Sequence, residues 1–394
     1  VFGLWLLHYL DDDPDTRKPG SIGVLLVLFL ATALLSGVGA LTSADNDRYA
    51  VIYFLKTYAG YLSFFPALLL IRKDRRNAMV ICVVIVLAAA VLGLITAYNG
   101  IVGAGERTYM RETGIRVFSR QVWIVSIGFL FVFFNLYAKG RSRLPLPLAG
   151  AILFMTGVGI LLSQTRGVWL GVLGSVVAGI LISSIKREQG RSRIRGILRP
   201  LLTFATIALV AVMAVGNLSL LSTEGIAERA GSIGEESLED VSFLTRLVLW
   251  NNAVREISSG GDLLLGKGLG YEFTTLRPDL SLSAGMVIVR THWWIDGSLF
   301  QVALNMGLVG VVLFVALFAR LFFVSLRAYL ASGDDDESAI LLGAIASLVF
   351  LVVSSFSMSC LTNYRFTNTW GVLMAVIVAL STKSKQAPRG TEAP

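Results

Sequence analysis

The sequence predicts an all-α polytopic integral membrane protein, and three observations support this fold class. Hydrophobic residues make up 55% of the 394 residues and charged residues only 15%, whereas a soluble domain averages about 25% charged residues. The mean hydropathy is +0.72. Apolar runs of about twenty residues recur along the chain, and this is the length that a helix needs to cross the hydrocarbon core of a bilayer. We therefore expect lipid to surround most of the chain.

The apolar runs predict ten full transmembrane helices. A stub at residues 1–10 is too short to span, and we read it as the end of a truncated helix. β-Barrel strands are excluded because the runs are too long and do not alternate. The ten predicted spans are residues 21–42, 50–71, 77–97, 121–138, 144–163, 167–185, 200–219, 297–325, 339–359 and 366–382.

Basic residues predict the orientation of these spans. The net charge is +8, and most Lys and Arg residues cluster in alternate connections, which the positive-inside rule places in the cytoplasm. The excess is expected of a membrane protein, so we expect no nucleic-acid partner. The chain then divides into N-terminal helices (1–219), a long periplasmic loop (220–292), C-terminal helices (293–382) and a cytoplasmic tail (383–394).

The long loop is predicted to be partly helical and to lie on the membrane. Residues 237–240 read as a helix cap, and residues 258–261 end the helical pattern. The rough apolar stripe between them consists of Leu244, Leu247, Val248, Val254 and Ile257. A loop of this length is usually functional.

Two arginines are candidates for binding an anion. Arg166 sits between two apolar runs, and no acidic residue lies within ten positions on either side. It is either an interfacial arginine that reaches the headgroups or an anion site, since the guanidinium fork suits phosphate oxygens. Arg246 lies four residues before Trp250, on the same face of the predicted helix. It forms either a cation–π pair with that ring or a second phosphate clamp.

His292 and Asp296 are candidates for acid–base chemistry where the loop meets the next span. The intervening Trp293 and Trp294 are expected in the interfacial aromatic belt. His292 titrates near neutral pH and could accept a proton from a hydroxyl. Asp296 would share a helical face with it, and either orients the imidazole or is itself the base. The alternative is that His292 is merely a solvated interfacial residue.

Other motifs predict no cofactor or metal. The glycine-rich stretch at residues 266–270 fits no phosphate-loop pattern and is interpreted as a turn. Lys56 falls inside a span, as either a functional or a snorkelling charge. The two cysteines, Cys82 and Cys360, give neither a disulfide framework nor a metal ligand set. Metal-dependent and serine-nucleophile mechanisms have no motif to support them.

Four pieces of the sequence together resemble the O-antigen ligase and O-antigen polymerase family of bacterial envelope glycosyltransferases. They are LLSQTRGVWLGVL (161–173), SFLTRLVLWNNAVREI followed by LLLGKGLGYEF (242–273), the long outer loop, and THWWIDGSLFQVALNMGLVGVVLF (291–314). The resemblance covers mainly the second half of the chain.

The resemblance implies a metal-independent enzyme of the inner membrane, active at the periplasmic face in lipopolysaccharide or related polysaccharide biosynthesis. Its donor would be an undecaprenyl-diphosphate-linked glycan, and its acceptor lipid A-core or another carrier-linked repeat unit. The two functional arginines of the family carry over onto Arg166 and Arg246, and Arg290 is a further candidate for binding the diphosphate.

The register of the resemblance leaves the base open. Counted back from Gly307, the family's usual His-Asn-x-Tyr-Leu stretch falls on residues 296–300, and His292 lies one helical turn earlier. The base is therefore His292 or Asp296. The rival interpretation is a multi-span transporter of a small anionic solute or a lipid-linked sugar. A transporter predicts charged residues deep within several spans, whereas here the charge within the spans is largely limited to Lys56.

Overall fold

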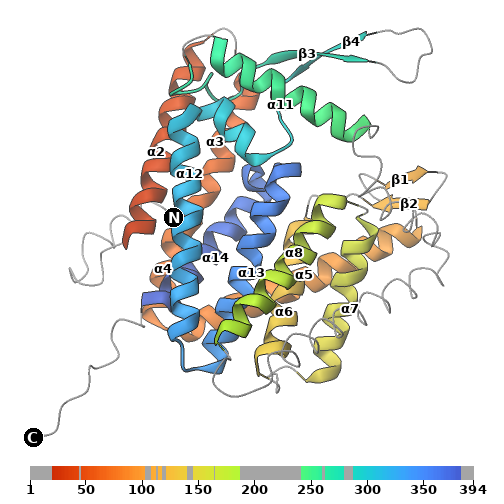
Figure 1. Ribbon diagram of the computed structural model, residues 1–394, viewed down its shortest axis with the longest axis vertical. Helices are drawn as coiled ribbons and strands as arrows, with labels where there is room; N and C mark the ends of the chain where they lie inside the picture. The colour runs from red at the N-terminus through yellow and green to blue at the C-terminus, as the bar shows by residue number, and fades with distance from the viewer. Residues whose placement is uncertain are drawn as a thin grey trace, which may run out of the picture. The chain divides into compact units, whose positions relative to one another are not determined.

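The computed structural model describes residues 20–43, 46–102, 108–111, 114–117, 121–139, 145–163, 165–186, 241–259, 262–278 and 287–382 (Figure 1). Most of these residues are helical. The helices are α2 (Gly20–Thr42), α3 (Arg48–Ala59), η1 (Gly60–Ser63), α4 (Phe64–Lys73), α5 (Arg76–Val102), α6 (Val122–Lys139), α7 (Leu146–Leu162), α8 (Arg166–Lys186), α11 (Val241–Ser259), α12 (Ser298–Ala331), α13 (Asp335–Ser357), η2 (Cys360–Thr362) and α14 (Tyr364–Thr382).

The described part of the chain contains six segments long and apolar enough to cross a membrane. They are Gly20–Thr42, Arg48–Lys73, Arg76–Gly100, Arg166–Lys186, Ser298–Ala331 and Asp335–Phe356. Two shorter apolar helices, Val122–Tyr137 and Leu146–Leu162, coincide with two more predicted spans. Predicted span 366–382 forms α14, and 200–219 lies outside the described residues. The chain is a multi-pass membrane protein, and ten spans remain a prediction.

Two short β-hairpins interrupt the helical fold, and the expectation of an all-α chain missed them. Strands β1 (Thr108–Arg111) and β2 (Gly114–Val117) pair antiparallel, as do β3 (Phe273–Pro278) and β4 (Val287–His292). The second hairpin lies in the long loop. Its signal was the run of β-branched residues in FTTLRP and VIVRTH, because such side chains favour strands.

The chain forms two compact units that do not follow its order. The first comprises residues 1–63, 232–320 and 354–371, and the second residues 64–231, 321–353 and 372–394. Helices α12, α13 and α14 each begin in one unit and end in the other. The predicted division into helices, loop and tail describes membrane topology, which these units do not test.

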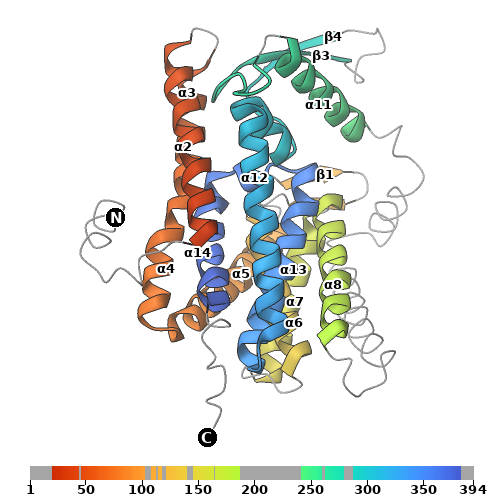
Figure 2. The ribbon, with the colours of Figure 1, turned by 60° about the vertical axis from the view of Figure 1, so that its left-hand side comes forward.

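In the first unit, α2 and α12 run antiparallel. Three contacts show this, because the α2 numbers fall while the α12 numbers rise: Ser36 with Asn305, Phe29 with Phe314, and Ser21 with Arg320. Helix α11 and the β3–β4 hairpin lie at the end where α12 begins (Figure 2). The predicted loop elements therefore gather at one end of this unit.

Helix α12 is broken at Gly307, whose backbone (φ 61°, ψ −158°) is not helical. A regular helix would bond the amides of Leu308 and Val309 to the carbonyls four residues earlier. Instead these amides bond to the carbonyls of Leu263 (2.9 Å) and Leu264 (3.2 Å). The carbonyl of Leu304 in turn accepts a hydrogen bond from the Lys267 amide (2.8 Å). Residues 262–271, here called the glycine loop, thus complete the hydrogen bonding of the broken helix.

Among the described side chains, the buried face of α11 shares only Ile257 with the predicted stripe. Ala253 (0% exposed) and Ile257 (7%) are buried on it, and they pack with Phe273, Ile295 and Leu304. The predicted stripe residues Leu247, Val248 and Val254 are exposed. The sequence could not select the face because α11 carries apolar residues on several sides, and its packing partners decide which are covered. The predicted end of the helix is confirmed, since α11 stops at Ser259.

In the second unit, glycines allow α5 and α7 to pack closely. A Cβ atom at Gly93 of α5 would lie 2.6 Å from the carbonyl oxygen of Met155 in α7, and one at Gly159 would lie 3.1 Å from Gly93 Cα. Small residues at helix crossings are typical of membrane bundles, in which van der Waals packing holds helices together.

Polar contacts in the second unit join helix ends that the basic residues predict to lie on the same side of the membrane. Arg75, between α4 and α5, pairs with Glu337 at the start of α13 (2.7 Å). Lys186, at the end of α8, donates to the Ser332 carbonyl (2.7 Å) and to Ser338 Oγ (2.8 Å) after α12. These contacts agree with the alternation of connections that the basic residues predict.

Candidate functional site

The candidate site lies in the first unit, at the junction between β4 and α12. His292 is the last residue of β4, and α12 begins at Ser298. The intervening residues 293–297 are not helical, and Gly297 has a φ of 104°. The prediction that His292 and Asp296 share a helical face is therefore wrong, because the helix starts two residues after Asp296.

Helix α11 contacts the junction through both residues singled out in its sequence. Arg246 Nε lies 3.6 Å from Asp296 Oδ2, and the two side chains are 28% and 46% exposed. Trp250 Nε1 donates to the Asp296 carbonyl (2.5 Å), and its ring stacks on Phe300 at a centroid distance of 4.8 Å. The expected cation–π pair is thus replaced: Arg246 faces a carboxylate, and Trp250 stacks on another ring.

The Arg246–Asp296 ion pair is a long one. Its separation exceeds ordinary hydrogen-bond lengths, and both side chains remain partly solvated. Pairs of this kind contribute about 0–1 kcal/mol. Among the described residues, Arg246 Nε is buried without a hydrogen-bond partner, so the guanidinium keeps donor capacity for an anion such as a diphosphate.

Buried polar side chains hold the junction backbone in place. Gln301 Oε1 accepts from the Ile295 amide (2.7 Å), and Gln301 Nε2 donates to the Trp293 carbonyl (3.4 Å). Ser359 Oγ donates to the Ile295 carbonyl (2.6 Å). Gln301 is fully buried. Because a buried polar group is costly unless paired, these bonds fix the path of the segment that carries Asp296.

The same network extends into the helix bundle, and the sequence reasoning missed it. Gln301 Nε2 also donates to Asn305 Oδ1 (3.2 Å), and Asn305 Nδ2 donates to the Tyr58 hydroxyl (3.2 Å). The signal was two amide side chains four residues apart in an otherwise apolar span, since that spacing places them on one helix face.

His292 and Arg290 belong to the β3–β4 hairpin. His292 pairs with Phe273, and their ring centroids are 6.2 Å apart. The imidazole is half-buried. Arg290 pairs through its backbone with Thr275, and its side chain lies outside the described part of the structure. The hairpin therefore brings His292 to the junction as a strand end rather than as part of a helix.

The glycine loop is a turn, as interpreted from its sequence. Gly266, Gly268 and Gly270 all have positive φ. Lys267 Nζ lies 2.8 Å from Asp262 Oδ2, and this hydrogen bond is the largest cause of a raised pKa for Lys267. The amine is consequently a cation at neutral pH that is already paired within the loop.

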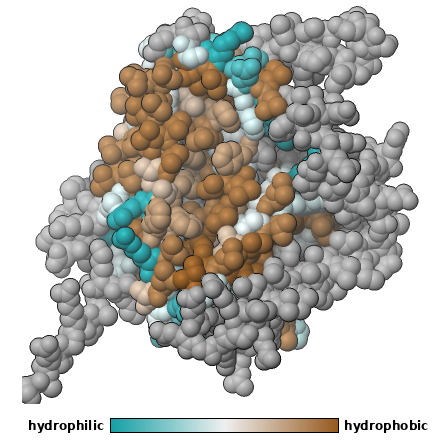
Figure 3. Space-filling model, in the orientation of Figure 1, coloured by the Kyte–Doolittle hydropathy of each residue, from teal (hydrophilic) through white to brown (hydrophobic). Residues whose placement is uncertain are grey.

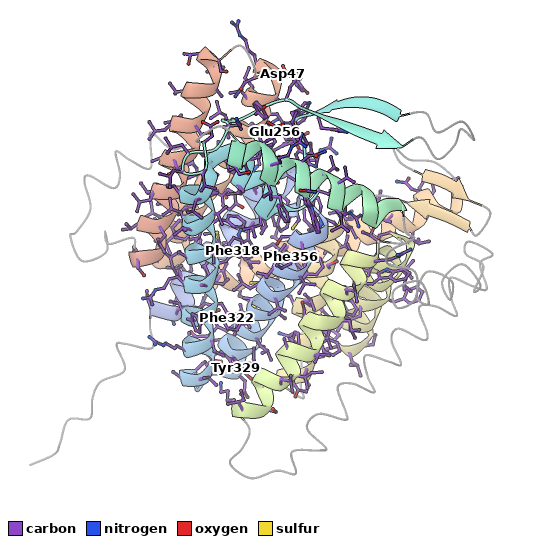
Figure 4. All side chains as sticks on the ribbon, turned by 45° about the horizontal axis from the view of Figure 1, so that its top comes forward. Asp47, Glu256, Phe318, Phe322, Tyr329 and Phe356 are labelled. Atoms are coloured by element: carbon purple, nitrogen blue, oxygen red, sulfur yellow. The ribbon has the colours of Figure 1, made fainter. Side chains whose placement is uncertain are left out.

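The loop is also tied to neighbouring elements. The Tyr271 hydroxyl donates to Glu256 Oε2 of α11 (3.0 Å), and the Asp47 amide bonds to the Gly270 carbonyl (3.1 Å). Glu256 and Asp47 are labelled in Figure 4. The glycine loop thus links α11 with the start of α3.

Lys56 contacts an aromatic cluster beside the junction. Its Nζ lies 4.3 Å from the ring centroid of Tyr364, and Tyr53 contacts the rings of Tyr364, Trp293 and Trp294. Lys56 is exposed. Its exposure fits the expected snorkelling charge better than a functional charge buried within the span.

Arg166 belongs to the second unit, where it is the first residue of α8. A tight turn precedes it: the Thr165 carbonyl accepts bonds from the amides of Val168 and Trp169, and Trp169 Nε1 donates to the Ile160 carbonyl (3.0 Å). A basic residue at a helix N-terminus adds to the positive end of the helix dipole. Positive charge from both sources favours an anion at this position.

The chemistry available to the junction is charge stabilisation and proton transfer. It combines a guanidinium, a carboxylate and an imidazole-bearing strand end, and among the described residues no group of three or more His, Cys, Asp or Glu side chains could hold a metal ion. A comparison with models of known protein families gave no match, and a search among curated proteins gave none either.

Proposed function

We propose that the protein is a membrane glycosyltransferase of the O-antigen ligase or polymerase type, working at the periplasmic face of the bacterial inner membrane. The observation that carries this proposal is the contact of Arg246 with Asp296. It joins two residues that the resemblance selects from segments fifty positions apart. The donor is an undecaprenyl-diphosphate-linked glycan, and the acceptor is lipid A-core or a carrier-linked repeat unit.

The proposed reaction needs neither a metal nor a covalent intermediate. The acceptor oxygen bonds to the anomeric carbon of the donor glycan while the bond from that carbon to the diphosphate oxygen breaks. Charge then builds on the departing diphosphate, and Arg246 neutralises it. The resemblance assigns the same role to Arg166. The acceptor hydroxyl loses its proton to a base positioned beside it.

Between the two candidate bases, the geometry favours His292. The Asp296 carboxylate faces Arg246, so its role in the proposal is to orient the guanidinium before the donor binds. His292, at the end of β4, is the proposed base, because an imidazole is the side chain best suited to proton transfer near neutral pH. Arg290 stays a proposed diphosphate contact from the same strand.

A transporter is the second candidate, and the break in α12 is the observation that favours it. Discontinuous helices form the binding sites of many transporters. Here, however, the amides and carbonyl freed at Gly307 bond to the glycine loop, which supports a structural role for the break. Uptake of a lipid-linked sugar or small anion into proteoliposomes, without transfer, would favour the transporter.

The direct test of the proposal is glycan transfer by the purified protein. We expect product from an undecaprenyl-diphosphate glycan and either a lipid A-core acceptor or a second carrier-linked unit, in the presence of a chelator. Comparing the two acceptors distinguishes ligase from polymerase. Absence of transfer to both acceptors, with the donor intact, would contradict the proposal.

Variants of the two candidate bases should rank in a fixed order. We expect His292→Ala to reduce transfer by about 10²–10⁴-fold, the range for losing a general base. Asp296→Asn should cost less, because it removes the orientation of Arg246 while leaving the imidazole in place. Transfer rates of the two purified variants give the ranking. A more severe loss in Asp296→Asn would make Asp296 the base.

A further inference from the structure

The glycine loop carries three consecutive exposed leucines. Leu263, Leu264 and Leu265 are 54%, 59% and 70% exposed. A single exposed leucine needs no explanation, but contiguous exposed apolar surface marks a site of interaction. The ion pair of Asp262 with Lys267 joins the two ends of the segment that contains the leucines. The charged residues therefore flank the three apolar ones.

The loop is held alongside a membrane-spanning helix by its backbone. The carbonyls of Leu263 and Leu264 accept hydrogen bonds from α12, which is a candidate span. Non-helical backbone at membrane depth has to lie against protein that bonds its polar groups, and the carbonyls of Leu263 and Leu264 are bonded to α12 in this way.

The apolar surface of the loop continues onto α12. At the bonded positions themselves, Leu308 is 47% and Val309 38% exposed, and Val312 further along the helix is 56% exposed. The face that includes α2 and α12 is largely hydrophobic (Figure 3). In a span such as α12, side chains exposed in this way face lipid, because the surrounding solvent is hydrocarbon.

Contacts with α2 set the depth of the loop. A Cβ atom at Gly37 would lie 3.2 Å from Leu269 Cδ1, and one at Gly268 would lie 3.2 Å from Ala40 Cβ. Gly37 is five residues from the end of α2 at Thr42, which corresponds to roughly 8 Å along a helix. The loop therefore reaches below the end of a candidate span.

We infer that Leu263, Leu264 and Leu265 insert into the lipid bilayer beside α12, with the Asp262–Lys267 pair at headgroup level. The insertion fixes the attached α11, and with it Arg246, at a defined height over the membrane surface. The inference rests on the packing of the loop alone and holds whatever reaction the protein catalyses.

Spin labels in lipid nanodiscs test the inference. A nitroxide is attached to Leu264→Cys, and its collisions with oxygen, which partitions into lipid, are compared with collisions with a water-soluble nickel chelate. The side chain is exposed and the loop is held through its backbone, so the variant should fold. Leu263→Cys and Leu265→Cys provide independent positions, and the parent chain, whose two cysteines are buried, gives the background labelling.

Two matched positions calibrate the result. Val312→Cys on α12 is the lipid-facing reference, and Glu272→Cys, an exposed acidic position just after the loop, is the aqueous reference. We expect the oxygen-to-nickel ratio at residue 264 to match that at residue 312. A ratio equal to that at residue 272 would place the loop in water. Low access to both reagents would mean that protein covers the leucines, and either result overturns the inference.

Discussion

Replacing Arg246 with lysine should reduce glycan transfer by about 10²–10³-fold, the loss typical of removing one stabilising group from a developing oxyanion. Lysine keeps the positive charge next to Asp296 but lacks the planar fork that binds two phosphate oxygens at once. Because the charge is unchanged, the lost activity would reflect the missing planar fork. Steady-state rates with an undecaprenyl-diphosphate glycan donor provide the measurement.

The matched control is Arg255→Lys. Arg255 lies on the same helix and is exposed, and nothing places it in the site, so this variant should transfer normally. The folded state of Arg246→Lys should survive as well, because an ion pair of this exposure contributes only about 0–1 kcal/mol. Normal transfer by Arg246→Lys would remove Arg246 from the proposed mechanism.

Replacing Gly307 with alanine should sharply lower the yield and thermal stability of the folded protein. Its backbone (φ 61°, ψ −158°) occupies a region that essentially only glycine adopts, at a cost of about 1–3 kcal/mol for other residues. The new Cβ would also lie 2.5 Å from the backbone nitrogen of Gly266. The glycine loop would have to move, and the hydrogen bonds between the loop and α12 would be lost.

Gly39→Ala provides the control for this prediction. Gly39 lies in α2, and apart from its chain neighbours and the nearby backbone of its own helix, no heavy atom of the described residues lies within 4 Å of the position of its Cβ. Alanine is favoured over glycine in a helix by about 0.5–1 kcal/mol, so this variant should be neutral or slightly stabilised. Thermal unfolding in detergent compares the two. Equal melting temperatures would show that the break in α12 does not need glycine.

The sequence predicted the helices well because their signal is local. A run of apolar residues of the right length must span the membrane as a helix, whatever its neighbours are. The end of α11 was equally local, since two serines form its last residues and two glycines follow them in the sequence. The β3–β4 hairpin was missed because its strands are short and the membrane signal around them is much stronger.

The candidate site was predictable as a set of residues and not as an arrangement. Arg246, Asp296 and His292 were selected from motifs, but their geometry depends on where β4 ends and α12 begins. Spacing alone suggested a shared helix face for His292 and Asp296. The backbone at Gly297 and the hydrogen bonds of Gln301 direct the chain otherwise.

By itself, the sequence determined that the chain resides in a membrane, where most of its helices run and which residues carry charge at their ends, because these properties follow from composition and periodicity along one segment. Only the tertiary structure decided that Arg246 meets Asp296, that Ala253 joins Ile257 on the buried face of α11, and that the glycine loop completes α12. Each of these contacts joins segments separated along the chain, and a backbone amide freed at Gly307 can be satisfied only by a partner that folding brings to it.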